Sequence, residues 1–83
     1  MYFVYLIVSK NKKRTISYVG YTNNIEKRLK NHNDSKGAKF TKGRKWKLKF
    51  FKSYTKKNIA MQEEYKLKKN YKLRKKIKYG DVN

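Results

Sequence analysis

The first eight residues constrain the fold more than any other stretch of this chain. Tyr2–Val8 reads Tyr-Phe-Val-Tyr-Leu-Ile-Val, and β-branched and aromatic residues in such a run favour a strand. Both faces of that strand are apolar, which is typical of a strand buried on both faces, as a central strand is. We therefore expect Tyr2–Val8 to be the central strand of a sheet. The run is far too short to span a bilayer, and too short for a signal peptide.

The remaining sequence predicts two further strands and three helices. We expect strands near residues 1–8, 15–20 and 46–54, and helices near residues 24–32, 56–70 and 72–79. The expected fold class is α+β, with a three-stranded antiparallel sheet flanked by helices in the order β-β-α-β-α-α. No proline, repeat or linker divides the sequence, so residues 1–83 are expected to form a single domain.

Several local patterns refine this prediction. Asn23 is a candidate N-cap for the first helix, with Glu26 completing a capping box, and Thr55 is a candidate cap for the second helix. Ile25 and Leu29 are four residues apart and are expected to form the buried stripe of the first helix. Residues 33–45 hold two glycines and five basic residues, so we expect a long, mobile loop.

Composition excludes several kinds of site. The chain has no cysteine and one histidine, which excludes a disulfide framework, a thiolate zinc site and a Cys/His metal cluster. Eighty-three residues bury only about 60–65% of their unfolded surface, so the core is expected to be thin and rich in aromatic residues. A cytoplasmic location is expected.

The charge balance indicates a polyanionic partner. Lys and Arg number 25 against five Asp and Glu, giving a formal net charge of +20. An A+T-rich coding sequence raises lysine without any function behind it, but it should raise acidic residues as well. Nucleic acid is favoured over a membrane surface, because no segment sets a lysine face against a free apolar face. No obligate protein partner is evident.

The stretch from Tyr18 to His32 brings together groups suited to a phosphate. Tyr18 ends the second predicted strand, Gly20 permits a sharp exit, and a helix follows. Arg28 and His32 are four residues apart on that helix and therefore share a face. A phenol, a fixed cation and an imidazole are thus expected at one edge of the fold.

These residues carry a resemblance to a known family. The chain resembles the GIY-YIG nuclease superfamily, and more closely its small stand-alone bacterial members, from Tyr2 to about Leu73. The matching features are Phe3-Val4-Tyr5, Tyr18-Val19-Gly20, Arg28 with His32, the loop Lys36-Gly37-Ala38-Lys39-Phe40-Thr41, and Glu64-Tyr65-Lys66-Leu67-Lys68. Each motif alone is weak, but all five occur in order and at spacings similar to those of the family.

The chain also departs from the family pattern. Phe3 replaces the glycine of the first motif, and the hairpin between Tyr5 and Tyr18 is a few residues longer than usual. Asn23 stands where some members place a lysine, which puts a lysine-assisted proton transfer in doubt. The asparagine that some larger members use after their glutamate has no clear counterpart.

The resemblance implies a metal-dependent DNA endonuclease that hydrolyses phosphodiester bonds, acting on branched, nicked or damaged DNA in repair or recombination. It implies Glu64 as the ligand of Mg²⁺ or Mn²⁺, and Arg28 on the non-bridging phosphoryl oxygens. Tyr5 or Tyr18 would take the proton from water, for which the site must lower a phenol pKa. His32 would relay a proton or bind a phosphate oxygen.

Each of these residues also has a purely structural interpretation. Tyr5 and Tyr18 are plausible core aromatics, and Arg28 a solvated helix cation. His32, near the C-terminus of its helix, would interact favourably with the helix dipole when protonated. This structural interpretation and the catalytic one both stay open. Glu63 competes with Glu64, which we prefer because it matches the family pattern. We expect Tyr5, Tyr18, Arg28 and Glu64 to converge on one sheet face within a shared cleft. Glu64 on the face opposite Tyr18 would overturn this mechanistic interpretation.

Basic residues on the loop and the last helix are expected to contact the DNA backbone through phosphate rather than base contacts. They are Lys36, Lys39, Lys42, Arg44, Lys72 and Lys75. One alternative function is a non-catalytic basic nucleic-acid-binding protein on the same fold. Another, which charge alone would allow, is an accessory protein bound to RNA or the ribosome.

Overall fold

The computed structural model describes residues 1–80, which form one sheet and its covering helices. The elements are β1 (Tyr2–Lys10), β2 (Thr15–Thr22), α1 (Ile25–Asn33), the 3-10 turn η1 (Lys39–Thr41), β3 (Lys47–Tyr54), α2 (Lys57–Lys69) and α3 (Tyr71–Tyr79). The β-β-α-β-α-α order and the α+β class are as predicted. No helix within residues 1–80 is long and apolar enough to cross a membrane.

The three strands form an antiparallel sheet in the order β2-β1-β3. The apolar strand β1 is therefore central, as its composition predicts, and β2 is an edge strand. Tyr5 pairs with Gly20 and Ile7 with Tyr18, so these four residues lie on the same face of the sheet. A register shift between Leu6 and Ile7 interrupts the pairing with β3.

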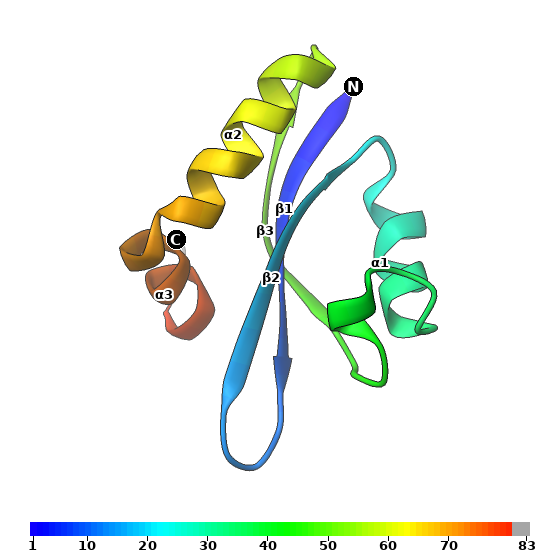
Figure 1. Ribbon diagram of the computed structural model, residues 1–83, viewed down its shortest axis with the longest axis vertical. Helices are drawn as coiled ribbons and strands as arrows, with labels where there is room; N and C mark the ends of the chain where they lie inside the picture. The colour runs from blue at the N-terminus through cyan, green and yellow to red at the C-terminus, as the bar shows by residue number, and fades with distance from the viewer. Residues whose placement is uncertain (81–83) are drawn as a thin grey trace.

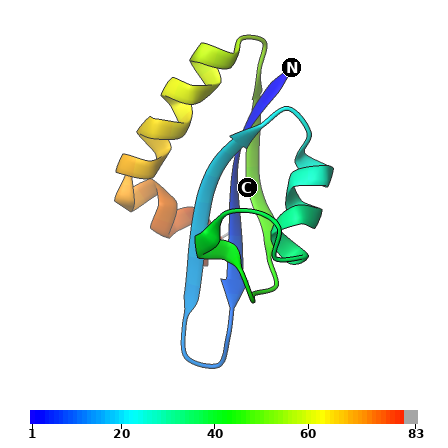
Figure 2. The same cartoon turned by 45° about the vertical axis from the view of Figure 1, so that its right-hand side comes forward.

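Helices cover both faces of the sheet, with α1 on one face and α2 and α3 on the other (Figures 1 and 2). The side chains of β1 alternate between the two layers. Val4, Leu6 and Val8 pack in the cluster that includes Ala60, Leu67 and Ile77 from α2 and α3. Tyr5 and Ile7 pack in a second cluster with Trp46, against which Tyr18 and Leu29 of α1 are also packed. The alternation thus directs Tyr5 and Tyr18 toward α1.

Two predicted helix caps are wrong, and a third helix boundary is confirmed. Asn24, rather than Asn23, caps α1, and its Oδ1 accepts the backbone N–H of Lys27 at 3.1 Å. Helix α2 begins one residue later than expected, with Lys56 at the N-cap and no side-chain cap. The break predicted at Asn70 is real, because Asn70 ends α2 and caps α3 by accepting the N–H of Leu73.

The segment between α1 and β3 is anchored to the rest of the fold, which differs from the mobile loop expected from its composition. The side chain of Asn33 bonds both backbone groups of Trp46, with Oδ1 accepting from its N–H and Nδ2 donating to its carbonyl. The indole N–H of Trp46 in turn donates to the carbonyl of Thr41 at 2.9 Å. These bonds hold η1 close to α1.

Candidate active site

A chain of hydrogen bonds links β1, α1 and η1 beneath the β2 edge. The Tyr5 hydroxyl lies 2.8 Å from Nε2 of His32, and Nδ1 of the same ring lies 2.8 Å from Oγ1 of Thr41. Tyr5 is 2% exposed, and His32 and Thr41 are fully buried. His32 is the buried residue of α1, whereas the expected stripe residues Ile25 and Leu29 are only half-buried.

The direction of each bond follows from Thr41. Its hydroxyl donates to the carbonyl of Ala38 at 2.8 Å, so its oxygen accepts from Nδ1–H of His32. The lone pair on Nε2 then accepts the proton of the Tyr5 hydroxyl. Burial, and secondarily the charge of Arg28, lowers the pKa of His32 from 6.5 to about 4. The imidazole is therefore neutral near pH 7, and its Nε2 accepts a hydrogen bond from the protonated phenol.

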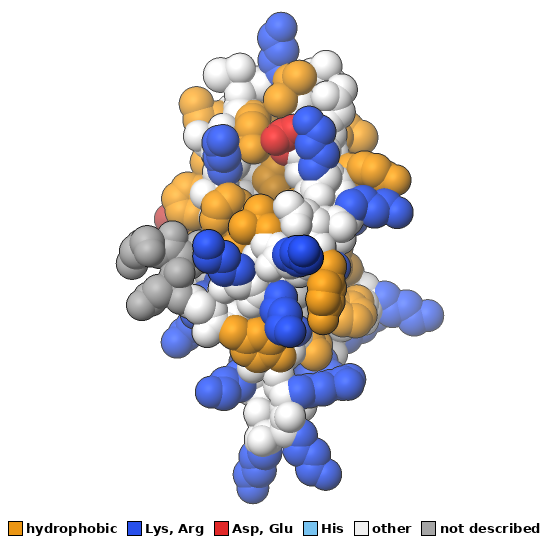
Figure 3. Space-filling view, turned by 90° about the vertical axis from the view of Figure 1, so that its left-hand side faces the viewer, with side chains coloured by type: hydrophobic (Ala, Val, Ile, Leu, Met, Phe, Trp, Pro, Cys, Tyr) orange, Lys and Arg blue, Asp and Glu red, His pale blue; other side chains and the backbone are white. Residues whose placement is uncertain are grey.

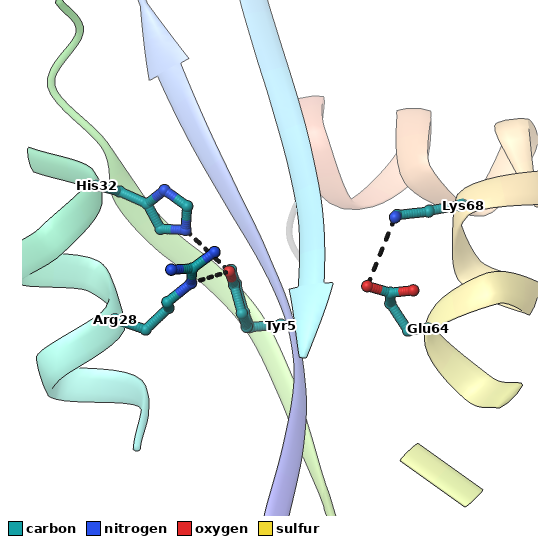
Figure 4. A network of polar contacts seen from close by, with 5 residues as sticks. All are labelled: Tyr5, Arg28, His32, Glu64 and Lys68. Atoms are coloured by element: carbon teal, nitrogen blue, oxygen red, sulfur yellow. Dashed lines mark hydrogen bonds and ion pairs between the residues drawn. The ribbon is translucent and has the colours of Figure 1, made fainter. Parts of the chain in front are cut away.

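Arg28 contacts the same phenol oxygen from the preceding turn of α1. Its Nε donates to the Tyr5 hydroxyl at 3.3 Å (Figure 4). This bond, together with the proximity of Tyr18, raises the pKa of Arg28, against the effect of burial. Burial raises the pKa of Tyr5, although Arg28 acts to lower it. The expectation of a lowered phenol pKa is thus wrong for Tyr5 in the protein alone, because desolvation outweighs the neighbouring cation.

Tyr18 lies on the edge strand β2, where its ring packs in a cluster of aromatic side chains. Its ring meets the His32 ring edge to face, with centroids 5.2 Å apart. It stacks on Phe40 at 6.1 Å and also contacts Trp46. Phe40 is 57% exposed, so the outer side of this stack faces solvent. Tyr18 therefore connects the buried hydrogen-bond chain with the surface.

Two glycines provide the clearance that the hydrogen-bond chain needs. A Cβ on Gly20 would collide with the hydroxyl oxygen and the ring of Tyr5, the residue paired with it on the neighbouring strand β1. A Cβ on Gly37 would collide with Nδ1 of His32. The glycine of the Tyr18-Val19-Gly20 motif is therefore required by the close approach of Tyr5.

Glu64 does not share the face of the other four residues, and that expectation is wrong. Glu64 lies on α2, which covers the face opposite α1, and Figure 4 shows Glu64 and Lys68 on one side of β2 with Tyr5, Arg28 and His32 on the other. Its carboxylate lies 3.5 Å from Nζ of Lys68. The cause is the packing of α2, whose residues Ala60 and Leu67 lie in the core cluster on the face opposite α1. The charge of Glu64 nevertheless adds to the rise in the Tyr5 pKa.

A shallow hollow lies at the exposed edge of β2 and is lined by residues from both sides of the sheet. Its volume is about 340 Å³, and we call it the β2-edge hollow. It is lined by Ser17, Tyr18, Val19, Phe40, Lys68 and Arg74. Tyr18 and Phe40 belong to the α1 side, whereas Lys68 is the ion-pair partner of Glu64 on α2. The hollow therefore connects the two sides that β2 separates.

The basic residues expected to contact a nucleic-acid backbone are nearly all exposed. Arg44 is half-buried, and the other five are exposed: Lys36, Lys39, Lys42, Lys72 and Lys75. Lys36, Lys39, Lys42 and Arg44 lie on the segment between α1 and β3. Lys72 and Lys75 lie on α3, on the other face of the sheet. Figure 3 shows Lys and Arg side chains distributed over the α2–α3 side of the molecule, with few acidic side chains between them.

Sequence reasoning missed three residues that the structure adds to this region. Thr41 orients His32, while Lys68 and Arg74 line the β2-edge hollow. Thr41 and Lys68 belong to segments that were recognised as motifs, although neither was given a role. Arg74 lies among seven other basic residues between 66 and 78, so its position gave no signal in the sequence.

Comparison with known proteins identifies the family. The family model described as the GIY-YIG catalytic domain matches residues 1–78. The chain belongs to the GIY-YIG family. Nuclease chemistry on a nucleic-acid substrate is what this family supplies, generally with a divalent metal ion. Within residues 1–80 there is no group of three or more His, Asp or Glu side chains that could hold a metal ion unaided.

Similar bacterial proteins carry the family designation UPF0213, which states no activity. UPF0213 protein BLi00048/BL00536 of Bacillus licheniformis is 58% identical over 63% of this GIY-YIG chain and 55% of its own length. UPF0213 protein YazA of Bacillus subtilis is 46% identical over 82% of the chain and 67% of its own length. UPF0213 protein OB0043 of Oceanobacillus iheyensis is 41% identical over 81% of the chain and 76% of its own length. The chain thus spans between about half and three quarters of these relatives. No solved structure matches it.

Proposed function

We propose that this protein is a metal-dependent DNA endonuclease of the GIY-YIG type, which hydrolyses phosphodiester bonds across the β2 edge. The observation that carries the proposal is the placement of Arg28 and His32 on one phenol oxygen, that of Tyr5. A core tyrosine needs one partner for its hydroxyl, whereas this one is held by a proton acceptor and a cation together. That arrangement suits proton transfer beside an anionic substrate.

The proposed proton path begins at the attacking water and ends on His32. The Tyr5 oxygen takes a proton from the water as its own proton passes to Nε2 of His32. Thr41 keeps Nδ1–H on the far side of the ring, so Nε2 stays free to accept. The neutral state of the imidazole, caused by burial, is required for this step. Tyr18 remains the alternative base, because it lines the β2-edge hollow.

Arg28 has two roles in this proposal. Its Nε holds the phenol oxygen, and the planar guanidinium leaves other N–H groups for the non-bridging oxygens of the phosphate. The positive charge stabilises the additional negative charge of the transition state. A lysine would supply the charge without the two directions of donation.

Glu64 is the proposed protein ligand of the metal ion. A single carboxylate suits Mg²⁺ or Mn²⁺, because Mg²⁺ keeps several waters and takes further oxygens from substrate phosphates. The donor chemistry therefore fits, although Lys68 pairs with the carboxylate in the free protein and has to be displaced. When bound, the ion would polarise the phosphoryl group and stabilise the leaving oxygen.

The separation of Glu64 from Tyr5 by β2 overturns the expected mechanism, in which all four residues act from one cleft on one sheet face. The proposed function therefore requires a substrate that straddles the edge strand. Two observations favour that geometry. The Glu64 charge acts on the pKa of Tyr5, and the β2-edge hollow is lined by Tyr18 from one side and by Lys68 from the other. The same separation favours the second candidate function, a nucleic-acid-binding protein without catalysis.

The deciding experiment compares Glu64→Ala with Glu63→Ala. Supercoiled, nicked and branched DNA are incubated with each variant, with and without Mg²⁺ or Mn²⁺, and binding is measured separately in EDTA. Glu64→Ala should lose several orders of magnitude in cleavage, because metal stabilisation of the transition state is worth several kcal/mol. Its binding should be unchanged or tighter, since a charge that repels DNA is removed. Glu63, paired with Lys66 at 3.0 Å, is the matched control and should stay active when replaced.

The outcomes separate the two candidate functions. No cleavage by the wild type with either metal would overturn the nuclease proposal in favour of the binding protein. Retained cleavage by Glu64→Ala would overturn the role of Glu64 as the metal ligand. The preference among the three DNA forms reports directly on a role in repair or recombination.

A further inference from the structure

Arg74 of α3 has an unsatisfied hydrogen-bonding group beside the candidate active site. The residue is half-buried and lines the β2-edge hollow. Its Nε is fully buried and has no hydrogen-bond partner among residues 1–80. The guanidinium carbon lies 5.8 Å from the centre of the Tyr71 ring, a cation–π contact that gives its N–H groups no acceptor oxygen. A buried donor left unpaired on a cation is costly to stability.

The charge of Arg74 is also uncompensated. The three ion pairs within residues 1–80 join Lys30 to Asp34, Lys66 to Glu63 and Lys68 to Glu64, and none includes Arg74. The other cation of the hollow, Lys68, reaches its carboxylate only at 3.5 Å. Within the described part of the chain, the hollow thus presents one unpaired cation and one weakly paired cation, and no carboxylate lines it. Such a lining favours an anion.

The rest of the hollow suits a nucleotide phosphate. An edge strand directs alternate backbone N–H groups outward, and Ser17 adds a hydroxyl. The exposed face of Phe40, stacked on Tyr18, provides an apolar wall for a sugar or a base. The planar fork of an arginine matches phosphate oxygens in two directions.

We propose that the β2-edge hollow is a second phosphate site, in which Arg74 and Lys68 hold the backbone phosphate next to the one bound by Arg28. Tyr18 is shared by the two sites, because it contacts His32 on one side and lines the hollow on the other. This inference deepens the proposed function by naming how the strand is held across β2. It rests on that function only for the identity of the polyanion, and it does not depend on cleavage.

The test measures binding of a short DNA duplex by fluorescence anisotropy in EDTA, at several salt concentrations, for Arg74→Met and Arg14→Met. Methionine keeps the apolar stem of arginine and removes its charge and donors. Arg74→Met should bind about tenfold more weakly at low salt, as expected for one charge-assisted hydrogen bond. Its salt slope should fall by about 0.9, the value for one phosphate contact. Arg14, exposed in the β1–β2 turn, is the matched control for the same loss of charge.

Chemical unfolding of the same variants separates binding from structure. Arg74→Met should be as stable as the wild type or more stable, because the unpaired donor is removed. Equal affinities for Arg74→Met and Arg14→Met would overturn the proposal, as would a loss of affinity that accompanies a loss of stability. If the wild type binds DNA through Arg74 but cleaves nothing, the second phosphate site stands and the nuclease proposal fails.

Discussion

The Tyr5 hydroxyl donates its hydrogen bond to Nε2 of His32 over 2.8 Å, and the two residues come from different elements, β1 and α1. Thr41 fixes the ring from its other nitrogen, so the phenol proton has one defined acceptor. Arg28 contacts the same oxygen from a neighbouring turn of the helix. The phenol therefore has one defined, neutral acceptor for its proton. Because the pKa of Tyr5 is raised and that of His32 is lowered in the free protein, the transfer requires the charge of the bound substrate and metal ion.

Removing the Tyr5 hydroxyl should abolish this proton path while leaving DNA binding intact. We expect Tyr5→Phe to lower the cleavage rate by about 10²- to 10⁴-fold, the usual contribution of a positioned acid or base. Tyr65→Phe is the control, because Tyr65 is 59% exposed and remote from the hydrogen-bond chain. The measurement is single-turnover plasmid cleavage, with binding followed in EDTA. If Tyr18→Phe abolishes cleavage and Tyr5→Phe does not, Tyr18 is the base.

Acid should destabilise the protein through His32. Its pKa is lowered from 6.5 to about 4 in the folded state, so the unfolded chain binds more protons between these values. The free energy of unfolding should therefore be unaffected above the unfolded pKa and should fall by about 3 kcal/mol as the pH drops toward the folded pKa. Urea unfolding across that range measures the fall, and His32→Gln should flatten it.

The same pKa can be measured directly. His32 is the single histidine of the chain, so its imidazole signals in an NMR titration need no assignment. A midpoint well below 6.5 is expected. A midpoint near the ordinary value would contradict both the buried neutral imidazole and the proton path that depends on it.

A methyl group at Gly20 should displace the Tyr5 ring. The added Cβ would collide with the hydroxyl oxygen and with the ring carbon that bears it. We expect Gly20→Ala to lower the free energy of unfolding by about 1–3 kcal/mol, as overpacking does, and to abolish cleavage. Gly43→Asn is the control, since no atom lies within 4 Å of an added Cβ there and asparagine tolerates the positive φ of +75°. Thermal unfolding of both variants decides; an unaltered Gly20→Ala would show that Tyr5 can shift without loss.

DNA affinity should fall steeply as salt rises, because Lys and Arg release counterions from phosphates. Replacing Lys36, Lys39 and Lys42 together with glutamine should reduce the salt slope by about 0.9 for each phosphate that is no longer neutralised. The same replacement at three exposed residues of the β1–β2 hairpin, Lys10 at the end of β1 and Lys12 and Lys13 in the turn, removes equal charge and serves as the control. Equal slopes for the two triple variants would show that net charge, rather than the segment before β3, determines binding.

The sequence by itself determined the element order and the central strand. The run of β1 is apolar on both faces, which is typical of a strand buried on both faces of a sheet. Arg28 and His32 are four residues apart, close to one helical turn, and therefore share one helix face. The motif glycine Gly20 was also recognisable, but the expected reason, a sharp exit from the strand, is wrong. Gly20 lies inside β2 and leaves space for Tyr5, which became visible only in the packed structure. Caps were less well determined, because Asn23 and Asn24 are adjacent and chemically identical, and the backbone selects the second.

Only the tertiary structure decided which of the site side chains lie in contact, and which protonation state each of them has. Burial, a property of the whole fold, keeps His32 neutral and raises the pKa of Tyr5 against the pull of Arg28. Helix α2 packs on the face of the sheet opposite α1, which places Glu64 behind β2. A helix that follows β3 can cover either face, and spacing along the sequence carries no information about which. The orphaned Nε of Arg74 and the hollow beside it exist only once α3 packs on β2, since they are made by residues far apart in the chain.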